Sequence, residues 1–158
     1  MRVPQLSLRI DNKPGCLVEP CRILAQHGIN ILTLALADQD DHGTLRLIVR
    51  DWRKAQEALT AAGLSVAVGD VLAVEVRDEP GGLLELLDVF ARAGINVAYM
   101  YAITERRGDQ AVMLFDFDDL DAAVLALARH GINPVRAVAL FDHLAEDDHD
   151  ALGIARQI

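Results

Sequence analysis

The chain has 158 residues, which is enough for one ordinary domain or two small ones. A hydrophobic fraction of 52% is too high for a disordered chain. The 15 basic and 24 acidic residues give a net charge of −9, which argues against nucleic acid and anionic membranes as partners, because both attract Lys and Arg. No apolar run approaches the roughly 18 residues of a membrane-spanning helix, and we expect a cytoplasmic protein.

The sequence contains an internal repeat. The motif KPGCL at residues 13–17 recurs as EPGGL at residues 79–83, 66 positions later, and eight of the seventeen positions from 14 to 30 are identical at this offset. Further along the chain the offset becomes 68. We place the two extra residues in the loop TERRGDQ, because loops accept insertions at little cost. The repeat predicts two copies of one unit packed as a pair.

The first copy predicts the element order βαββαβ. Alternating apolar residues predict the first strand, and Leu17, Cys21 and Leu24 form one helix stripe, which places Cys21 in the core. Gly28 and Gly63 follow the two helices as caps. The predicted strands are 5–10, 28–37, 44–50 and 64–70, and the predicted helices are 16–27 and 51–63.

The second copy repeats this order, with predicted strands at 72–77, 95–103, 112–117 and 134–140 and helices at 82–94 and 119–131. The order βαββαβ is typical of the ferredoxin-like fold. We therefore predict an α+β protein with two such units side by side, forming an eight-stranded antiparallel sheet with four helices on one face. The predicted domains are residues 1–70 and 71–142, followed by an acidic tail at 143–158.

Each Pro-Gly pair lies where a strand meets a helix. Pro fixes φ, and Gly permits a backbone conformation that other residues avoid. The first amides of the helix behind it lack helical partners, so the turn predicts a seat for a carboxylate. Asp78 and Glu79 suit an ammonium group, and together these are the two ends of an amino acid. The alternative is that Pro-Gly only makes a tight turn.

The unit βαββαβ with "DNKPGCL…HGIN" and "DEPGGL…AGIN" resembles the ACT domain. The two copies, over residues 3–142, resemble small stand-alone proteins made of tandem ACT domains. The resemblance implies a regulatory protein that binds a small ligand, usually an amino acid, at the interface between two ACT units and acts in trans on a partner. The alternative is a ligand-free regulatory subunit that docks on a metabolic enzyme.

The resemblance also implies the site. The ligand loops carried over by position are Asn12, Lys13, Gly15, Cys16 and Leu17 with Pro14, and Asp78, Glu79, Gly81, Gly82 and Leu83 with Pro80. Cys16 stands where the other loop has Gly82, and a side chain there is expected to narrow the first site. We therefore prefer the second loop.

Two further pairs complete the predicted site. Asn30 and Asn96 begin the second strand of each copy, where they support the loop or the ligand, or simply form a turn. Tyr99 and Tyr101 either close a pocket over the ligand or belong to a dimer interface. We expect a homodimer, because the second strands are apolar on both faces.

No catalytic motif is present, so we expect no enzymatic activity and no cofactor. The tail contains His143, Glu146, Asp147 and His149, a spacing that permits metal binding but is more typical of a solvated acidic surface.

Overall fold

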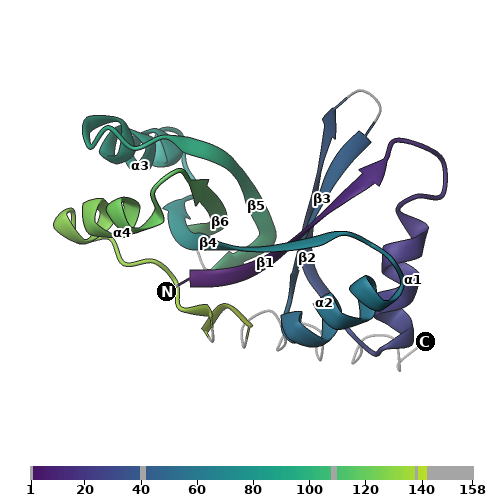
Figure 1. The fold of residues 1–158 in the computed structure, drawn as a ribbon. Helices are drawn as coiled ribbons and strands as arrows, with labels where there is room; N and C mark the ends of the chain where they lie inside the picture. The colour runs from purple at the N-terminus through teal and green to yellow at the C-terminus, as the bar shows by residue number, and fades with distance from the viewer. Residues whose placement is uncertain (1, 40–41, 108–109, 138, 142–158) are drawn as a thin grey trace. The chain divides into compact units, whose positions relative to one another are not determined.

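The computed structural model describes residues 2–39, 42–107, 110–137 and 139–141. This part of the chain contains six strands and four helices (Figure 1). Each predicted helix is present, and its ends lie within two residues of the predicted ones. In chain order the elements are β1 (Arg2–Asp11), α1 (Val18–Gln26), β2 (Ile31–Gln39), β3 (His42–Val49), α2 (Trp52–Ala61), β4 (Val66–Arg77), α3 (Gly82–Arg92), β5 (Val97–Arg107), β6 (Gln110–Phe117) and α4 (Leu120–Arg129).

The chain divides into two compact units. One is Pro4–Asp70, and the other joins Met1–Val3 to the chain from Val71 onward. In the first unit α1 and α2 contact each other, and in the second α3 and α4 do. Each helix pair contributes to an apolar core of its own.

The strands form a six-stranded sheet in the order β2-β3-β1-β4-β6-β5, so the prediction of eight strands is wrong. Two predicted strands, 64–70 and 72–77, are one continuous strand of twelve residues, β4. The predicted strand 134–140 contributes one isolated bridge, between Val135 and Ala73. Soon after this bridge the backbone turns helical, and the Leu140 amide donates to the Arg136 carbonyl at 2.9 Å.

The order of the sheet explains the missing strand. A strand has two hydrogen-bonding edges, and β4 has β1 on one edge and β6 on the other. The first residues of β1, Arg2 and Val3, group with the second unit. A full strand at 134–140 would compete with the start of β1 for the same edge of β4. The described part of this segment therefore forms only the single bridge to Ala73.

The two extra residues of the second copy lie in a strand, at the start of the predicted segment TERRGDQ, and not in a hairpin loop. Both hairpins close over two residues, since Gln39 pairs with His42 and Arg107 pairs with Gln110. In β5 the register shifts between Ala102, which pairs with Met113, and Arg106, which pairs with Ala111. Three residues of β5 thus lie opposite one residue of β6, Val112, which makes a β-bulge.

The core of the Pro4–Asp70 unit lies between its helices and strands. Leu6, Leu8 and Ile10 of β1 are buried, as their alternation predicts. The predicted stripe on the first helix is shifted, because α1 buries Pro20, Ile23 and Leu24, and Cys21 is exposed. The placement of Cys21 in the core is therefore wrong.

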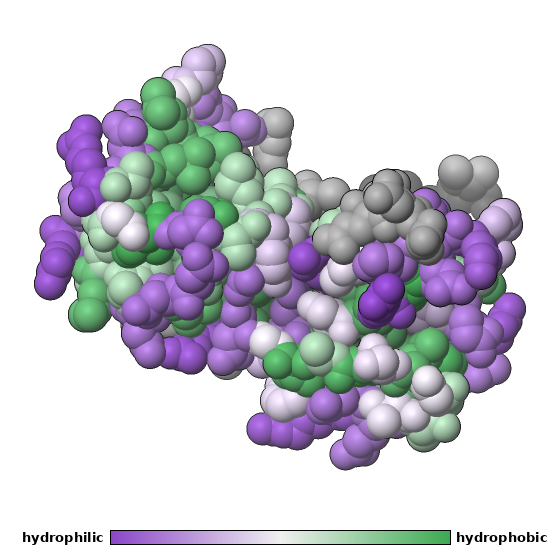
Figure 2. Space-filling model, turned by 45° about the horizontal axis from the view of Figure 1, so that its top comes forward, coloured by the Kyte–Doolittle hydropathy of each residue, from purple (hydrophilic) through white to green (hydrophobic). Residues whose placement is uncertain are grey.

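Several large apolar side chains remain at the surface. On the face shown in Figure 2, apolar side chains gather in patches among polar ones. The exposed large apolar residues are Leu17, Val18, Leu34, Leu36, Val68, Leu84, Met100 and Leu125. None of the helices in the described ranges is long and apolar enough to cross a membrane.

The core of the second unit is built around three phenylalanine rings. The centroid of Phe90 on α3 lies 5.8 Å from that of Phe115 and 4.8 Å from that of Phe117, both on β6. The geometry with Phe117 is edge-to-face, which aromatic rings favour.

We expect Phe90→Ala to lower the free energy of unfolding by about 3–5 kcal/mol, because the ring is 1% exposed and its loss leaves a cavity. Urea denaturation measures this. Leu125→Ala is the control, since Leu125 is 59% exposed and its truncation should change stability by about 0.5 kcal/mol or less. Equal effects of the two substitutions would contradict the assigned core.

Candidate functional site

The two Pro-Gly motifs form the same turn. Gly15 has φ of +88° and Gly81 has φ of +94°, in the left-handed region that favours glycine. The amide of Cys16 donates to the carbonyl of Lys13 at 3.2 Å, and that of Gly82 donates to Glu79 at 3.0 Å. Pro, then a left-handed Gly, then a closing amide is the geometry of a type II turn.

The helices behind the two turns begin at different positions. α3 begins at Gly82, directly behind the turn, whereas α1 begins at Val18, two residues after the matching Cys16. A Cβ on Gly82 would lie 2.1 Å from the carbonyl oxygen of Arg77, so the backbones meet there with no room for a side chain. The first turn has a cysteine, with a side chain, at the position of Gly82, and its helix starts two residues later.

Each turn carries an ion pair, with the charges exchanged. At the first turn Lys13 Nζ lies 3.0 Å from a carboxylate oxygen of Asp11. The matching positions of the second turn hold Glu79 and Arg77, whose carboxylate and guanidinium lie 2.7 Å apart. Arg77 also donates to the carboxylate of Glu85 on α3.

These pairs shift the titration of their members. The hydrogen bond from Lys13, together with its charge, holds the pKa of Asp11 below the ordinary 3.8. The same hydrogen bond and the Asp11 charge raise the pKa of Lys13. At the second turn the hydrogen bond to Glu85, and the charges of Glu79 and Glu85, raise the pKa of Arg77.

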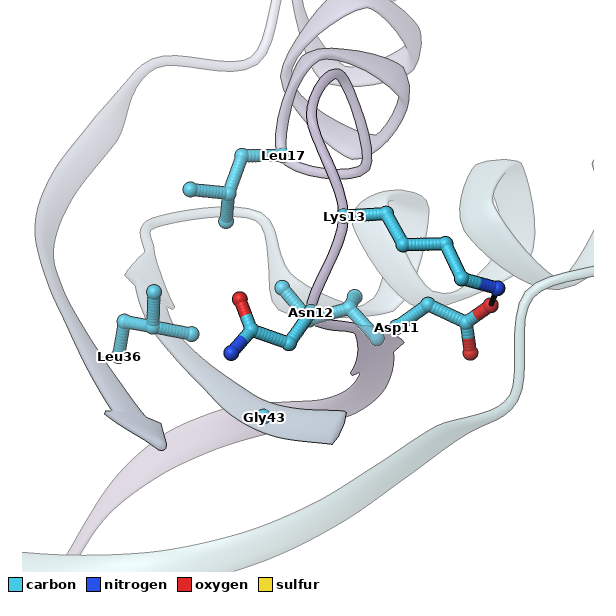
Figure 3. Close-up of a pocket in the computed structure, with 7 residues that line it drawn as sticks. Asp11, Asn12, Lys13, Leu17, Leu36 and Gly43 are labelled. Atoms are coloured by element: carbon cyan, nitrogen blue, oxygen red, sulfur yellow. Dashed lines mark hydrogen bonds and ion pairs between the residues drawn. The ribbon is translucent and has the colours of Figure 1, made fainter. Parts of the chain in front are cut away.

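A hollow of about 200 Å³ lies beside the first turn. Figure 3 shows the Asn12 side chain extending toward Leu36, with Leu17 on the far side of the opening, while Lys13 and Asp11 turn away as a pair. The hollow is lined by Ile10, Asp11, Asn12, Lys13, Leu17, Leu36 and Gly43. Its walls therefore come from β1, the turn, β2 and β3.

Four lining residues were not predicted as site residues: Ile10 and Asp11, at the end of β1, and a second pair, Leu36 and Gly43. The second pair lies on the β2–β3 hairpin, and the ladder pairs Ile10 with Gly43. A Cβ on Gly43 would lie 3.0 Å from Leu36 Cδ1, so the leucine lies directly over the glycine. The pairing of the β2–β3 hairpin with β1 was not predicted from the sequence. Knowledge of that register would have placed both residues beside the turn.

The second turn has a different surrounding. A hollow of about 310 Å³ lies between β4, α3 and Ile132, and of the predicted site residues it is lined by Gly82. The carboxylate of Glu79 is engaged by Arg77. The two turns thus differ in what surrounds them, and our preference for the second loop stays a prediction. Cys16 is not among the residues that line the first hollow, and its effect on a ligand site stays a prediction.

The two predicted Asn residues lie at the other end of the strands. Asn96 precedes β5, where Val97 pairs with Phe117, whereas the second turn follows Arg77, which pairs with Gln110 at the opposite end of β6. The Asn96 amide donates to Asp118 at 2.9 Å. Asn30 has the equivalent place before β2. Neither Asn shares a site with the turn of its own unit.

Tyr99 and Tyr101 are also separated from the second turn. Tyr101 pairs with Leu114, which lies four residues along β6 from the Gln110 that pairs with Arg77. At about 3.3 Å per residue this is roughly 13 Å. The tyrosines therefore do not close a pocket over this turn, and their role in a dimer interface stays a prediction.

No cluster of three or more His, Cys, Asp or Glu side chains suited to a metal ion occurs within the described ranges. The alternative metal ligands of the tail, His143, Glu146, Asp147 and His149, lie outside them.

The family described as an ACT domain pair matches residues 1–140. The chain belongs to this family. A solved structure similar to the ACT pair is that of protein BT0572 from Bacteroides thetaiotaomicron, with 30% identity and a TM-score of 0.82, covering 89% of this chain and 96% of that one. The comparison with curated proteins found no match.

Two further structures share the fold at lower identity. The regulatory subunit of aspartate kinase from Thermus thermophilus is 16% identical with a TM-score of 0.56, over 80% of this chain and 91% of that one. Aspartate kinase from Synechocystis is 18% identical with a TM-score of 0.55, over 85% of this chain and 26% of that one.

We expect Gly82→Ala to destabilise the ACT pair by about 1–3 kcal/mol, because its Cβ must displace the Arg77 carbonyl. Gly69→Ala is the matched control, since a Cβ there meets nothing within 4 Å. Chemical denaturation of both variants makes the comparison, and the control should be unchanged or slightly more stable. Equal stabilities would show that the close approach is absent.

We expect Asp11 to titrate below 3.8 in an NMR titration, and Lys13→Gln to return its pKa toward that value. A carboxyl with a depressed pKa stabilises the fold above its unfolded-state pKa, and this contribution is lost as the pH falls through the folded-state value. The pH dependence from Asp11 therefore lies below pH 3.8. An unchanged Asp11 titration in Lys13→Gln would disprove the pairing in solution.

Proposed function

We propose that this ACT pair is a non-catalytic regulatory protein that binds a free amino acid beside its first Pro-Gly turn. The observation that carries the proposal is the hollow formed by Asn12, Leu17 and Leu36 at a turn that resembles the family's ligand loop. The likeness in fold to an aspartate kinase regulatory subunit supports the regulatory role.

The chemistry of the hollow suits an amino acid. The Asn12 amide has both donor and acceptor atoms, and it points into the opening (Figure 3). Lys13 and Asp11 form an ion pair beside the opening, and we propose that the carboxylate and ammonium of a ligand exchange with the partners in this exposed pair. The remaining wall is apolar, as is typical of small-molecule sites.

The position of the hollow gives a route to regulation. A ligand there contacts the end of β1, the approach to α1 through Leu17, and the β2–β3 hairpin through Leu36 and Gly43. These segments are not consecutive in the chain, so a ligand favours the conformation in which all of them are correctly placed. Binding then shifts the population toward that conformation.

The output acts on a partner, for which a metabolic enzyme is our candidate. A homodimer and a cytoplasmic location remain predictions, as does a ligand position where two ACT units meet. The second candidate function, a ligand-free regulatory subunit, gains support from the Asp11–Lys13 pair, since each charge already has a partner at 3.0 Å.

We expect one or a few of the twenty amino acids to raise the melting temperature at millimolar concentration. A ligand at about ten times its Kd adds about 1.4 kcal/mol, or a few degrees for a chain of this size. Differential scanning fluorimetry with calorimetry on each hit measures this.

Asn12→Ala should abolish the shift, and Asp78→Ala, at the matching position of the second turn, should retain it. A protein that no amino acid stabilises would reject the ligand-binding proposal in favour of the ligand-free subunit. A shift that Asp78→Ala removes and Asn12→Ala retains would move the site to the second turn.

A further inference from the structure

We propose that the chain binds one apolar amino acid of about the size of leucine, in the first-turn hollow alone, with Leu17 and Leu36 selecting the side chain. This proposal rests on the proposed function and adds to it the ligand class and the number of sites.

The walls of the hollow are leucines that remain accessible to water. Leu17 is 42% exposed and Leu36 is 49% exposed, although both side chains line a concave site. Burying apolar surface is favourable, and a ligand side chain between them would remove water from three apolar surfaces at once. Ile10 completes the apolar floor.

The charges at the hollow do not suit a charged ligand side chain. Asp11 and Lys13 pair with each other, and Figure 3 shows both turned away from the leucines. In the proposed complex, the carboxylate and ammonium groups of the ligand would lie at the opening of the hollow, on the side of this ion pair. A charged side chain deeper in the hollow would lose water without an opposite charge nearby, which is costly.

The volume agrees with an apolar side chain of moderate size. The hollow measures about 200 Å³. A cavity of about 150 Å³ lined by aliphatic and aromatic residues accommodates a benzene molecule, so this space holds a leucine side chain.

The second unit lacks the same wall. The position matching Leu36 is Ala102, and the position matching Gly43 is Ala111, as the paired ladders confirm. The register break of β5 begins directly after Ala102, so the strand does not continue the wall as β2 does. These differences predict one site per chain.

The floor also depends on Gly43. A Cβ there would lie 3.0 Å from Leu36 Cδ1 and 3.2 Å from the carbonyl oxygen of Ala37. Because Gly43 has no side chain, Leu36 Cδ1 can occupy the space beside it. In the second unit Ala111 stands at this position.

The test is isothermal titration calorimetry of the full chain with L-leucine, compared with L-aspartate, L-lysine and L-threonine. We expect one L-leucine per chain and weaker binding of the other three. Leu36→Ala should weaken L-leucine binding by about tenfold or more, because contact with an apolar side chain is lost. Leu36→Met, of similar volume and polarity, should retain binding.

Met100→Ala is the matched control, since Met100 is another exposed apolar residue on an outer strand, at 39% exposure, and its truncation should leave the Kd unchanged. Melting temperatures of all variants distinguish lost binding from lost folding.

Each contrary result would overturn a different part of the proposal. Two leucines per chain would overturn the single site, and a strong preference for a charged or hydroxyl amino acid would overturn the apolar class, while the proposed function stands. Unchanged binding in Leu36→Ala would remove the ligand from this hollow. Binding of no amino acid at all would reject the proposed function itself.

Discussion

A glycine in the left-handed region reverses the chain from strand to helix in both halves of this molecule. Gly15 and Gly81 have nearly the same φ, each follows a proline, and each is followed by an amide that closes the turn. The next residue decides how closely the helix approaches the preceding strand. Gly82 has no Cβ and lies against the Arg77 carbonyl, whereas Cys16 has one, and α1 begins two residues later. The open surface beside the first turn follows from that difference and from the leucines around it.

The four helices, the hairpin between the helices of each copy and the repeat were predictable, because each depends on local periodicity, caps and turns. The number of strands was not. The apolar alternation of LSVAVGD and LAVEVR keeps the same phase and is compatible with one strand or two. The repeat places the boundary between its copies at Asp70, which favoured two strands, whereas the structure has one. Nothing in PVRAVAL shows that the edge of β4 is already taken by β1. Competition for a strand edge is a property of the whole sheet, so a local pattern does not reveal it.

Some residues of the candidate site were likewise predictable from the sequence, and others were not. Asn12, Lys13 and Leu17 follow from the turn motif, and they do line the hollow. Leu36 and Gly43 come from the hairpin opposite, and their nearness depends on a register that pairs Ile10 with Gly43. Asn30 and Asn96 were placed near a ligand because of the family resemblance, and Tyr99 and Tyr101 because of their side-chain chemistry, but the first helix of each unit carries the chain back to the end of the strands opposite the turn. Positions that are close in a motif are thus far apart in space.

The two copies share a backbone plan and differ in the groups that a ligand would meet. The ion pair at the turn is kept with its charges exchanged, Asp11 with Lys13 in one copy and Arg77 with Glu79 in the other. An exchange of this kind preserves the attraction across the turn, so it is compatible with the same fold, but it reverses the field that a ligand experiences. The second turn adds Asp78, and Glu85 joins Arg77, so acidic groups outnumber basic ones there. Under the proposed function, this surplus would repel a ligand carboxylate, which is one reason for proposing the first turn as the site.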